Sequence, residues 1–410
     1  MGAQEQLRLL IYSHDTFGLG HLRRCRAIAH ALVEHRHDLS VLILSGSPII
    51  GSYGFRSRVD FIRIPGVVKL RDGGYTSRGL DISIEDAIAI RETLIRATAE
   101  TFRPHIFLVD KEPLGLRGEV ADTLAMLKAS GSRLVLGLRD ILDDEEMLRE
   151  EWERKGAMRA LEKLYDDIWV YGSETVCDPL AGLDASPAVR AKMTYTGYLR
   201  RSAVAVAEPA NVENCDTEEP YLLVTTGGGG DGTSLVDWVL RAYEQFSDIA
   251  MRAIIVYGPF MHRDSQAEFN ARVEHLDKVC AVDFVTNFED LMKHSSGVVA
   301  MGGYNTVCEI LSFDKPSLIV PRTVPRREQI IRAAKLVELG LVQMLADDGT
   351  RDPAAMAAAL RALPDQQLPS AHQIPALLDG FAIIKAMIDH WLFDIDQPRT
   401  VLEIVHADGV

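Results

Sequence analysis

The sequence has no long hydrophobic run, no excess of positive charge and few cysteines. No stretch of about eighteen apolar residues occurs, which excludes a membrane-spanning helix. Residues 1–7 are polar and the apolar run at 7–12 is too short for a signal core, so we expect no secretory signal. Asp and Glu number 59 against 44 Lys and Arg, a net charge of −15, which disfavours nucleic-acid binding because phosphate backbones repel such a chain. A local basic patch can still bind a small phosphorylated ligand.

The five cysteines are scattered and are nowhere spaced as the paired ligands of a metal site. They are Cys25, Cys177, Cys215, Cys280 and Cys308. We therefore expect reduced thiols in a cytoplasmic protein. We expect neither a bound metal nor another cofactor.

The length of 410 residues is too great for one ordinary domain, and the apolar pattern divides the chain in two. Strand-like apolar runs alternate with helical stretches through residues 1–205, the pattern stops in a linker at 206–219, and it restarts over 220–372. Residues 373–410 form a tail whose spacing at 374–392 predicts one more helix, able to pack back on the first domain. Such alternation predicts an α/β fold of two Rossmann-like, doubly wound domains. The carboxyl ends of both sheets then face one central cleft.

The expected elements follow from short apolar runs for strands and from helical spacing of apolar residues for helices. Strands are expected at 8–13, 39–44, 61–64, 105–109, 134–138, 168–171, 193–196, 221–225, 252–257, 281–285, 297–301 and 317–320. Helices are expected at 21–34, 84–102, 234–246, 267–275, 288–294, 306–312, 328–339 and 353–363. The turns between a strand and the next helix are where open α/β sheets bind their ligands.

The first strand-to-helix turn reads Ser-His-Asp-Thr-Phe-Gly-Leu-Gly-His at residues 13–21. Gly18 and Gly20 permit a tight turn, and the next helix offers free N–H groups to an anion. A glycine-rich turn without a ligand fits this motif equally well. His21 is a candidate base because an imidazole at a helix start can accept a proton near neutral pH, although it could also cap the helix or pack. Three arginines on that helix, placed to serve a ligand or acidic neighbours, are Arg23, Arg24 and Arg26.

The corresponding turn of the second half reads Thr-Thr-Gly-Gly-Gly-Gly-Asp-Gly at residues 225–232. Successive glycines are costly in chain entropy, and they are explained where backbone amides wrap closely around a phosphate. The candidate phosphate-binding residues are Thr226, Gly227, Gly228 and Gly229. Because this turn has the same position in its domain as residues 13–21, we expect the two turns to face each other across the cleft.

A third glycine turn precedes the helix expected at 306–312. Its candidate binding residues are Gly302, Gly303, Asn305 and Thr306. Glu309 falls one turn inside the helix, where its carboxylate can accept hydrogen bonds from a ribose diol. Capping of backbone amides, or pairing with a neighbouring basic side chain, fits the spacing of Glu309 equally well.

A fourth, basic turn covers residues 321–329. Glu328 and Gln329 can bind sugar hydroxyls, and the arginines of the turn can bind phosphate. These arginines are Arg322, Arg326 and Arg327. The alternative is a solvated charged loop.

Four of these segments resemble the family 28 glycosyltransferases, whose type member is the N-acetylglucosaminyltransferase that completes the lipid-linked peptidoglycan precursor. The segments are Gly18-x-Gly20-His21, Thr226-Gly227-Gly228-Gly229, Asn-Phe-Glu-Asp-Leu-Met at 287–292, and Gly-Gly-Tyr-Asn-Thr-Val-Cys-Glu at 302–309. The resemblance is strongest over residues 220–345. It implies a GT-B fold, a nucleotide-sugar donor (usually a uridine diphosphate sugar) held by the second domain, and an acceptor held by the first.

Matched position by position, the resemblance assigns roles to single residues. Gly20 and His21 match the first-domain Gly-His, and Gly227–Gly229 match the loop that binds the diphosphate. Phe288 matches the residue beside the base, and Glu309 matches the acidic residue that binds the ribose. The resemblance thus places the donor on the second domain and the reacting base on the first.

The sequence also departs from the family pattern. Glu328 and Gln329 stand where the family has Gln-Gln on the donor sugar, and Arg201 ends a segment in which Tyr198-Leu199 replaces the family's Asn-Pro. These departures leave the donor sugar open, and the first half matches no known acceptor site. Residues 18–25 also resemble the nucleotide-sugar hydrolases of pseudaminic acid synthesis, which share the fold and attack the same bond with water.

The function expected is inverting transfer of a hexosamine-type sugar from a nucleotide donor, UDP above all, to a hydroxyl acceptor. His21 is the first candidate for the base that deprotonates the acceptor. Other groups at carboxyl ends of predicted strands that could share or take this role are His14, Asp15, Asp110 and Asp140. No Asp-x-Asp signature of metal-dependent sugar transferases occurs, so we expect no metal. The acidic pairs at 143–144, 166–167 and 347–348 are expected to be solvated.

Two alternatives share the same fold. One is a nucleotide-sugar hydrolase or epimerase, and the other is a non-catalytic protein that binds a nucleotide sugar. A lipid-linked acceptor would bring the protein to the inner face of the membrane as a peripheral protein. The basic residues near such a surface are Arg56, Arg58, Lys69 and Arg71, for which a solvated basic loop is the other interpretation.

Overall fold

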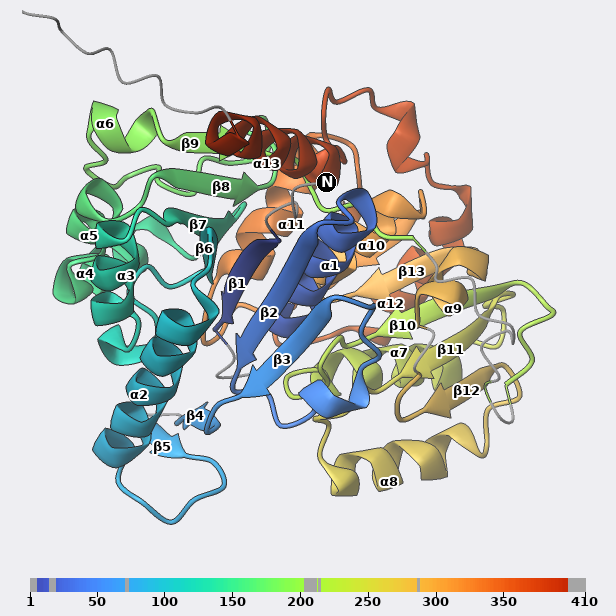
Figure 1. Cartoon of the computed structure of the whole chain (residues 1–410). Helices are drawn as coiled ribbons and strands as arrows, with labels where there is room; N and C mark the ends of the chain where they lie inside the picture. The colour runs from blue at the N-terminus through green and yellow to red at the C-terminus, as the bar shows by residue number, and fades with distance from the viewer. Residues whose placement is uncertain are drawn as a thin grey trace, which may run out of the picture.

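The computed structural model describes residues 6–14, 20–70, 74–202, 212, 215–285 and 288–396, and it contains two large parallel sheets (Figure 1). The first sheet has the order β3-β2-β1-β6-β7-β8-β9 and the second the order β12-β11-β10-β13-β14-β15. The first five strands of each sheet follow the strand order of the Rossmann fold. The expected α/β class with two Rossmann-like domains is confirmed.

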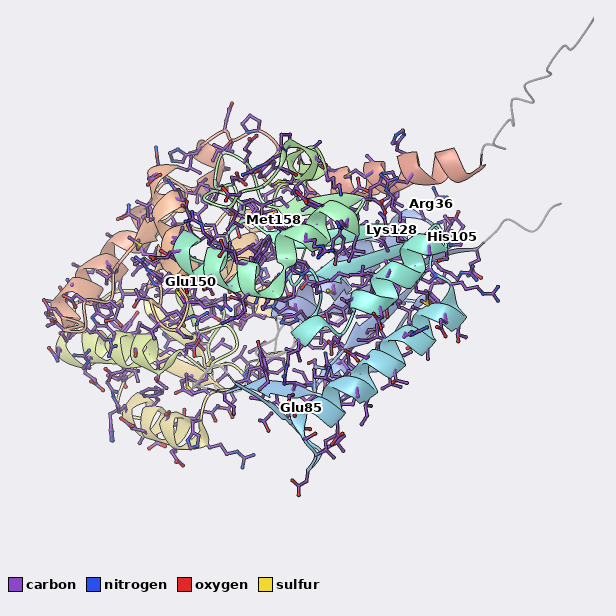
Figure 2. All side chains as sticks on the ribbon, turned by 90° about the vertical axis from the view of Figure 1, so that its left-hand side faces the viewer. Arg36, Glu85, His105, Lys128, Glu150 and Met158 are labelled. Carbon is purple, nitrogen blue, oxygen red and sulfur yellow. A yellow bond between two sulfur atoms is a disulfide. The ribbon has the colours of Figure 1, made fainter. Side chains whose placement is uncertain are left out.

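The strands of the first sheet are β1 Leu7–Ser13, β2 Leu39–Ser45, β3 Val59–Arg63, β6 Ile106–Asp110, β7 Arg133–Arg139, β8 Asp167–Tyr171 and β9 Met193–Tyr195. Its helices are α1 Gly20–His35, α2 Ile84–Phe102, α3 Ala121–Ala129, α4 Glu145–Lys155, α5 Ala157–Lys163 and α6 Pro187–Arg190. A short antiparallel ribbon, β4 Val67–Lys69 with β5 Tyr75–Ser77, precedes α2. Figure 2 looks onto these helices, with Glu85 in the first turn of α2, Lys128 on α3 and Met158 on α5.

The strands of the second sheet are β10 Tyr221–Thr225, β11 Arg252–Val256, β12 Val279–Val282, β13 Gly297–Ala300, β14 Ser317–Ile319 and β15 Gln343–Met344. Its helices are α7 Thr233–Gln245, α8 Arg263–Val273, α9 Phe288–His294, α10 Tyr304–Ser312, α11 Glu328–Glu338 and α12 Pro353–Ala362. None of the helices in the described part of the chain is long and apolar enough to span a bilayer.

Both faces of the first sheet are buried under helices. Successive side chains of a strand point to opposite sides of the sheet, so each strand contributes to both cores. Leu9 and Ile11 of β1 pack with Ile28 of α1 on one face. Leu10 of β1 packs with Ile95 of α2 on the other face. The apolar cluster on the α1 side continues into α10 and β13, so the two domains share one core there.

The last helix, α13 Gly380–Asp396, belongs to the C-terminal tail but lies on the first domain (Figure 1). Trp391 stacks on Trp169 of β8 with ring centroids 5.7 Å apart, and Asp389 accepts a 2.6 Å hydrogen bond from His35 of α1. The helix begins six residues later than the expected start at 374, because Ala376 has a φ of 54° and the chain turns there before it enters the helix.

A disulfide joins Cys215, just before β10, to Cys280 of β12, with Cα atoms 5.7 Å apart. The expectation that all five cysteines are reduced is therefore wrong. The two residues are 65 positions apart in the sequence and meet only because β12 and β10 belong to one sheet. Cysteine usage thus gives no argument for a cytoplasmic location.

Candidate functional site

A cavity of 210 Å³ lies between the two domains and is lined by both. The first domain contributes Gly20, His21, Arg23, Arg24 and Arg139. The second contributes Thr226, Gly227, Gly228, Gly229, Gly230, Asp231, Phe260, Met301, Gly303, Tyr304, Asn305, Thr306, Arg322, Glu328 and Gln329. Asp15 and Gly18 of the first glycine turn lie outside the described residues.

The position of this cavity follows from the topology. In each sheet the strand order reverses between the first strand and its neighbour, β1 and β6 in one sheet and β10 and β13 in the other. Loops at the carboxyl ends of such strand pairs diverge to opposite faces and leave a crevice. His21 follows β1, Asp110 ends β6, and the glycine turn at Gly227–Gly230 follows β10, so all three stand at these two reversal points.

His21 and Asp110 form a buried hydrogen-bonded pair beneath the cavity. Nδ1 of His21 lies 2.5 Å from Oδ2 of Asp110, whose side chain has no solvent exposure. Arg24 holds the same carboxylate with Nε and Nη2, at 2.8 and 2.7 Å. Burial alone would raise the pKa of Asp110, but Arg24 and His21 hold it well below its usual range.

The ionised Asp110 fixes the protonation of His21. Burial lowers the pKa of His21 to about 4, even though Asp110 opposes this shift, so the imidazole is neutral at pH 7. Two acceptors cannot approach to 2.5 Å without a proton, so Nδ1 carries the hydrogen and donates it to Asp110. Nε2 is then a proton acceptor, as a general base requires.

The turn after β10 has the geometry of an anion-binding loop. Gly227 and Gly229 have φ angles of 69° and 92°. Positive φ angles at alternate residues are typical of turns whose backbone N–H groups bind an anion. A Cβ at Gly229 would come within 2.5 Å of the Tyr257 carbonyl oxygen, so no side chain fits there. This contact explains why the sequence has glycine at this point of the turn.

The third glycine turn contributes only in part. Gly303, Asn305 and Thr306 line the cavity, whereas the carbonyl oxygen of Gly302 accepts a 3.2 Å hydrogen bond from Arg332. The Asn305 side chain connects the domains, because its amide donates to the Gly20 carbonyl oxygen at 3.0 Å. Its own oxygen accepts a 2.9 Å hydrogen bond from Arg201, which is not part of the cavity lining.

Glu309 is fully buried and forms an ion pair with an arginine. Its Oε1 accepts a hydrogen bond from Arg23 of the first domain, and Arg23 also contacts Glu289 at 3.0 Å. Oε2 of Glu309 has no hydrogen-bond partner, and burial raises the pKa of the carboxyl. Glu309 and Phe288 do not line the cavity. Glu309 thus forms an ion pair with Arg23, and its contact with a ribose stays a prediction.

Glu328 and Gln329 both line the cavity at the start of α11. Oε1 of Glu328 accepts a 2.7 Å hydrogen bond from Arg322, while its Oε2 is buried without a partner. Oε1 of Gln329 accepts a 3.2 Å hydrogen bond from the Arg322 backbone N–H. Burial alone would raise the pKa of Glu328, but the Arg139 and Arg322 guanidinium groups bring it below its ordinary value.

The basic turn and the acidic pair at 143–144 correct two expectations. Arg326 does not face the cavity but binds Asp143 at 2.9 Å and Glu151 at 3.0 Å, in the first domain. Arg327 likewise binds Asp144 at 3.0 Å. The side chain of Asp143 is only 1% exposed, so this pair is not a solvated face. These residues join the domains because α4 and the basic turn meet at the interface.

Asp140, another candidate base, is bound on both carboxylate oxygens by side chains of the interior. Arg332 of α11 holds both of its carboxylate oxygens at 2.8 Å, and Tyr198 donates to Oδ2 at 2.7 Å. Neither Asp140 nor Arg332 has any solvent exposure. Asp140 therefore joins the two domains and cannot reach an acceptor hydroxyl.

A second, larger cavity of 540 Å³ lies in the first domain. It is lined by His14, Tyr75, Glu112, Pro113, Leu114, Gly115, Leu116, Arg117, Gly118, Arg154, Lys155 and Ala157. The ring of His14 meets the ring of His21 edge to face with centroids 5.8 Å apart, so this cavity begins beside the candidate base. Burial lowers the pKa of His14 well below its ordinary value, so it too is neutral.

Sequence reasoning missed Arg139 as a cavity residue. It is the last residue of β7 and directly precedes Asp140, the residue that the sequence predicts as the candidate at this position. A basic residue at the carboxyl end of a buried strand is the signal that could have identified it.

Comparison with known proteins agrees with this architecture. Residues 222–376 match the glycosyltransferase family 28 C-terminal domain. An uncharacterised glycosyltransferase of Methanosarcina acetivorans is 24% identical over 353 residues, 80% of this chain and 83% of that protein. The UDP-N-acetylglucosamine–N-acetylmuramyl-(pentapeptide) pyrophosphoryl-undecaprenol N-acetylglucosamine transferase of Rhodopseudomonas palustris is 28% identical over 152 residues, 37% of this chain and 41% of that enzyme.

The crystal structure of Acinetobacter baumannii MurG has the same fold, with a TM-score of 0.57, 11% identity, and coverage of 94% of this chain and 99% of that one. The likeness in structure extends over both domains, whereas the match to the family covers the second domain. The chain is a family 28-like glycosyltransferase with the GT-B fold.

Proposed function

We propose that the chain is an inverting transferase that moves a hexosamine-type sugar from a uridine diphosphate donor to a hydroxyl acceptor without a metal. The observation that carries the proposal is that His21, which is hydrogen-bonded to Asp110, and the glycine turn Gly227–Gly230 line one cavity from different domains. A base on one side and an anion-binding turn on the other are the two groups that displacement of a nucleoside diphosphate needs.

In the proposed step Nε2 of His21 removes the proton of the acceptor hydroxyl. The acceptor oxygen then forms a bond to the anomeric carbon on the face opposite the leaving group. The bond between that carbon and the diphosphate oxygen breaks, and its electron pair leaves with the diphosphate. Asp110 stabilises the imidazolium that results, because its carboxylate accepts the hydrogen of Nδ1.

The leaving group takes its negative charge into the glycine turn. The N–H of Gly227 already donates to the Thr225 hydroxyl oxygen at 3.2 Å, so the backbone N–H groups of Gly228–Gly230 are the donors proposed to stabilise that charge. Arginines at the cavity can neutralise the diphosphate, the task that a metal ion performs in other transferases. Metal independence is therefore part of the proposal.

The donor sugar is proposed to lie against Glu328 and Gln329. The unpartnered Oε2 of Glu328 supports this, since a buried carboxylate oxygen without a donor is suited to accept a hydrogen bond from a sugar hydroxyl. The Rhodopseudomonas relative, by its name, uses UDP-N-acetylglucosamine. Arg23 occupies Oε1 of Glu309, so a ribose contact by Glu309 would use the unpartnered Oε2.

The acceptor is proposed to occupy the 540 Å³ cavity that begins beside His14. This cavity combines apolar side chains such as Leu114 and Leu116 with the charged side chains of Arg154 and Lys155. It therefore suits an acceptor with both polar and apolar parts.

A thermal-shift panel and a donor-only assay test the proposal. UDP-N-acetylglucosamine should raise the melting temperature more than UDP-glucose, dTDP-glucose or GDP-mannose, because ligand that binds only the folded state stabilises it. Incubated with that donor alone, the protein should release sugar slowly, and a chelator should leave turnover with acceptor unchanged.

Three results would contradict parts of this proposal. Rapid, stoichiometric sugar release without acceptor would identify a hydrolase, and tight binding without any turnover would identify a binding protein. Loss of turnover on chelation, restored by manganese, would contradict metal independence. If none of the four nucleotide sugars stabilises the protein, the proposal that the cavity binds a sugar donor is contradicted.

A peripheral contact with a membrane surface is part of the proposal, because the Rhodopseudomonas relative is named for an undecaprenol-linked acceptor. Arg58 does not serve this contact, since its guanidinium donates to the carbonyl oxygens of Val33, Arg36 and Leu39. Arg56 pairs with Glu34 at 2.9 Å, and Arg71 lies outside the described residues. Exposed apolar side chains at and before α2 are better candidates: Leu80, Ile90 and Leu94.

Replacing Leu80, Ile90 and Leu94 together with asparagine should lower binding to vesicles of phosphatidylglycerol and phosphatidylcholine about tenfold or more, because each apolar side chain contributes when it leaves water. Co-sedimentation with the vesicles measures the bound fraction. Val337→Asn on α11, at a similarly exposed apolar position, is the matched control and should bind as the unaltered protein does. If the triple variant binds vesicles as well as the unaltered protein does, these three side chains do not form the membrane contact.

A further inference from the structure

Four arginines line the cavity between the domains, and carboxylates hold three of them. Arg23 pairs with Glu309 and Glu289, Arg24 with Asp110, and Arg322 with Asp231 and Glu328. The fourth is Arg139. Its side chain takes part in no hydrogen bond or ion pair with any residue that the structure describes.

The surroundings of Arg139 make this lack of a partner costly. It ends β7 inside the interdomain crevice, and its Nε is buried without an acceptor. Desolvation lowers the pKa of Arg139 to about 10, although the charge of Glu328 opposes that shift. The guanidinium is still protonated at neutral pH, so the cavity has a positive charge in its lining whose buried Nε lacks an acceptor.

The same cavity is lined by the glycine turn Gly227–Gly230 of the second domain, in which the N–H groups of Gly228–Gly230 are the candidate anion donors. An anion bound at that turn would therefore share the cavity with the Arg139 guanidinium of the first domain. A planar guanidinium with several N–H donors can bind two oxygens of one phosphate at once.

We infer that Arg139, a residue of the first domain, binds the donor through its phosphate groups and so joins the diphosphate to both halves of the cleft. This inference rests on the proposed function, which supplies the nucleoside diphosphate. Arg24 and Arg322 are poorer candidates, because each would first have to give up a carboxylate that it already binds. Arg139 has no such contact to lose.

One consequence concerns selectivity for the phosphates over the nucleoside. Since Arg139 contributes only to the phosphate contact, its removal should weaken the binding of UDP and of inorganic pyrophosphate. The binding of uridine should be unaffected. Binding by titration calorimetry to Arg139→Gln should fall about ten- to a hundredfold for UDP and for pyrophosphate. Arg139→Lys keeps the positive charge but lacks the planar N–H donors of the guanidinium. Its affinity for UDP and pyrophosphate should lie between those of the unaltered protein and of Arg139→Gln.

The matched control is Arg133→Gln, at the other end of the same strand, where the arginine pairs with Asp167 at 2.6 Å and does not line the cavity. It should bind UDP, pyrophosphate and uridine as the unaltered protein does. Circular dichroism of each variant checks that it is folded before titration.

The outcomes separate this inference from the proposed function. If the unaltered protein binds UDP and Arg139→Gln binds it equally well, the role of Arg139 is overturned and the donor site stands. If Arg139→Gln loses uridine binding to the same extent as UDP binding, Arg139 shapes the cavity instead of binding phosphate, which also overturns the inference. If the unaltered protein binds neither UDP nor pyrophosphate, the donor site and the role of Arg139 fall together.

Discussion

His21→Ala is expected to lower kcat about 10²- to 10⁴-fold, the usual contribution of a positioned general base, while donor affinity stays within about twofold. The reason is that His21 lines the cavity and its Nδ1 is bound to Asp110, which leaves Nε2 as the proton acceptor, whereas the donor is proposed to be held mainly by the second domain. Steady-state kinetics with donor and acceptor, and calorimetry with the donor alone, measure the two quantities separately.

His35→Ala is the matched control for this substitution. His35 is the last residue of the same helix, α1, and pairs with Asp389 on α13, far along the helix from the cavity. It should leave kcat unchanged. Equal losses of turnover and of donor affinity in His21→Ala would show that His21 holds the donor instead of acting as the base.

The dependence of the reaction on pH gives an independent check on the same residue. A histidine at its ordinary pKa of about 6.5 loses half of its base form at that pH. Burial lowers the pKa of His21 to about 4, so the neutral, active form persists to lower pH. We expect kcat/KM to stay level from about pH 8 to 5 and to fall only as the pH approaches 4, and an acid limb centred near 6.5 would contradict the assignment.

The fold and the location of the site followed from the sequence because both depend on local patterns. Apolar runs placed nearly every strand of the two sheets, and the glycine turns after β1 and β10 placed His21 and Gly227–Gly230. In a doubly wound sheet, chemistry collects at the carboxyl ends of strands, so order along the chain is enough to find it. The roles of these site residues remain predictions.

Contacts between the domains could not be predicted in this way. Arg332 and Asp140 are 192 positions apart, and Arg23 and Glu309 are 286 apart. No periodicity or motif links residues across such distances, because their pairing depends on how two separately folded sheets dock. Glu309 and Asp140 therefore looked like residues available to a ligand, whereas each is used by an arginine of the other domain.

Asp140→Asn is expected to lower the free energy of unfolding by about 3–5 kcal/mol, because it leaves the Arg332 guanidinium buried without its counter-ion. Both side chains are fully buried. In the variant, the amide oxygen at position 140 and the carbonyl oxygens of Gly302 and Ile141 can still accept hydrogen bonds from Arg332, but none of them carries the negative charge that balances the guanidinium. Urea denaturation followed by circular dichroism measures the change. Glu338→Gln, which breaks an exposed pair with Lys335 on the same helix, should cost no more than about 1 kcal/mol.

The double variant Asp140→Asn/Arg332→Gln separates the loss of the pair from the penalty of an unpaired charge. If the penalty arises mainly from the buried guanidinium, removing it as well should recover part of the stability, and the double variant should be more stable than the sum of the two single changes predicts. Strict additivity would show that the two residues do not act together. Turnover per folded molecule should be nearly unchanged in Asp140→Asn, because Asp140 has no solvent exposure and does not line the cavity. A loss of a hundredfold or more would return Asp140 to the candidates for the base.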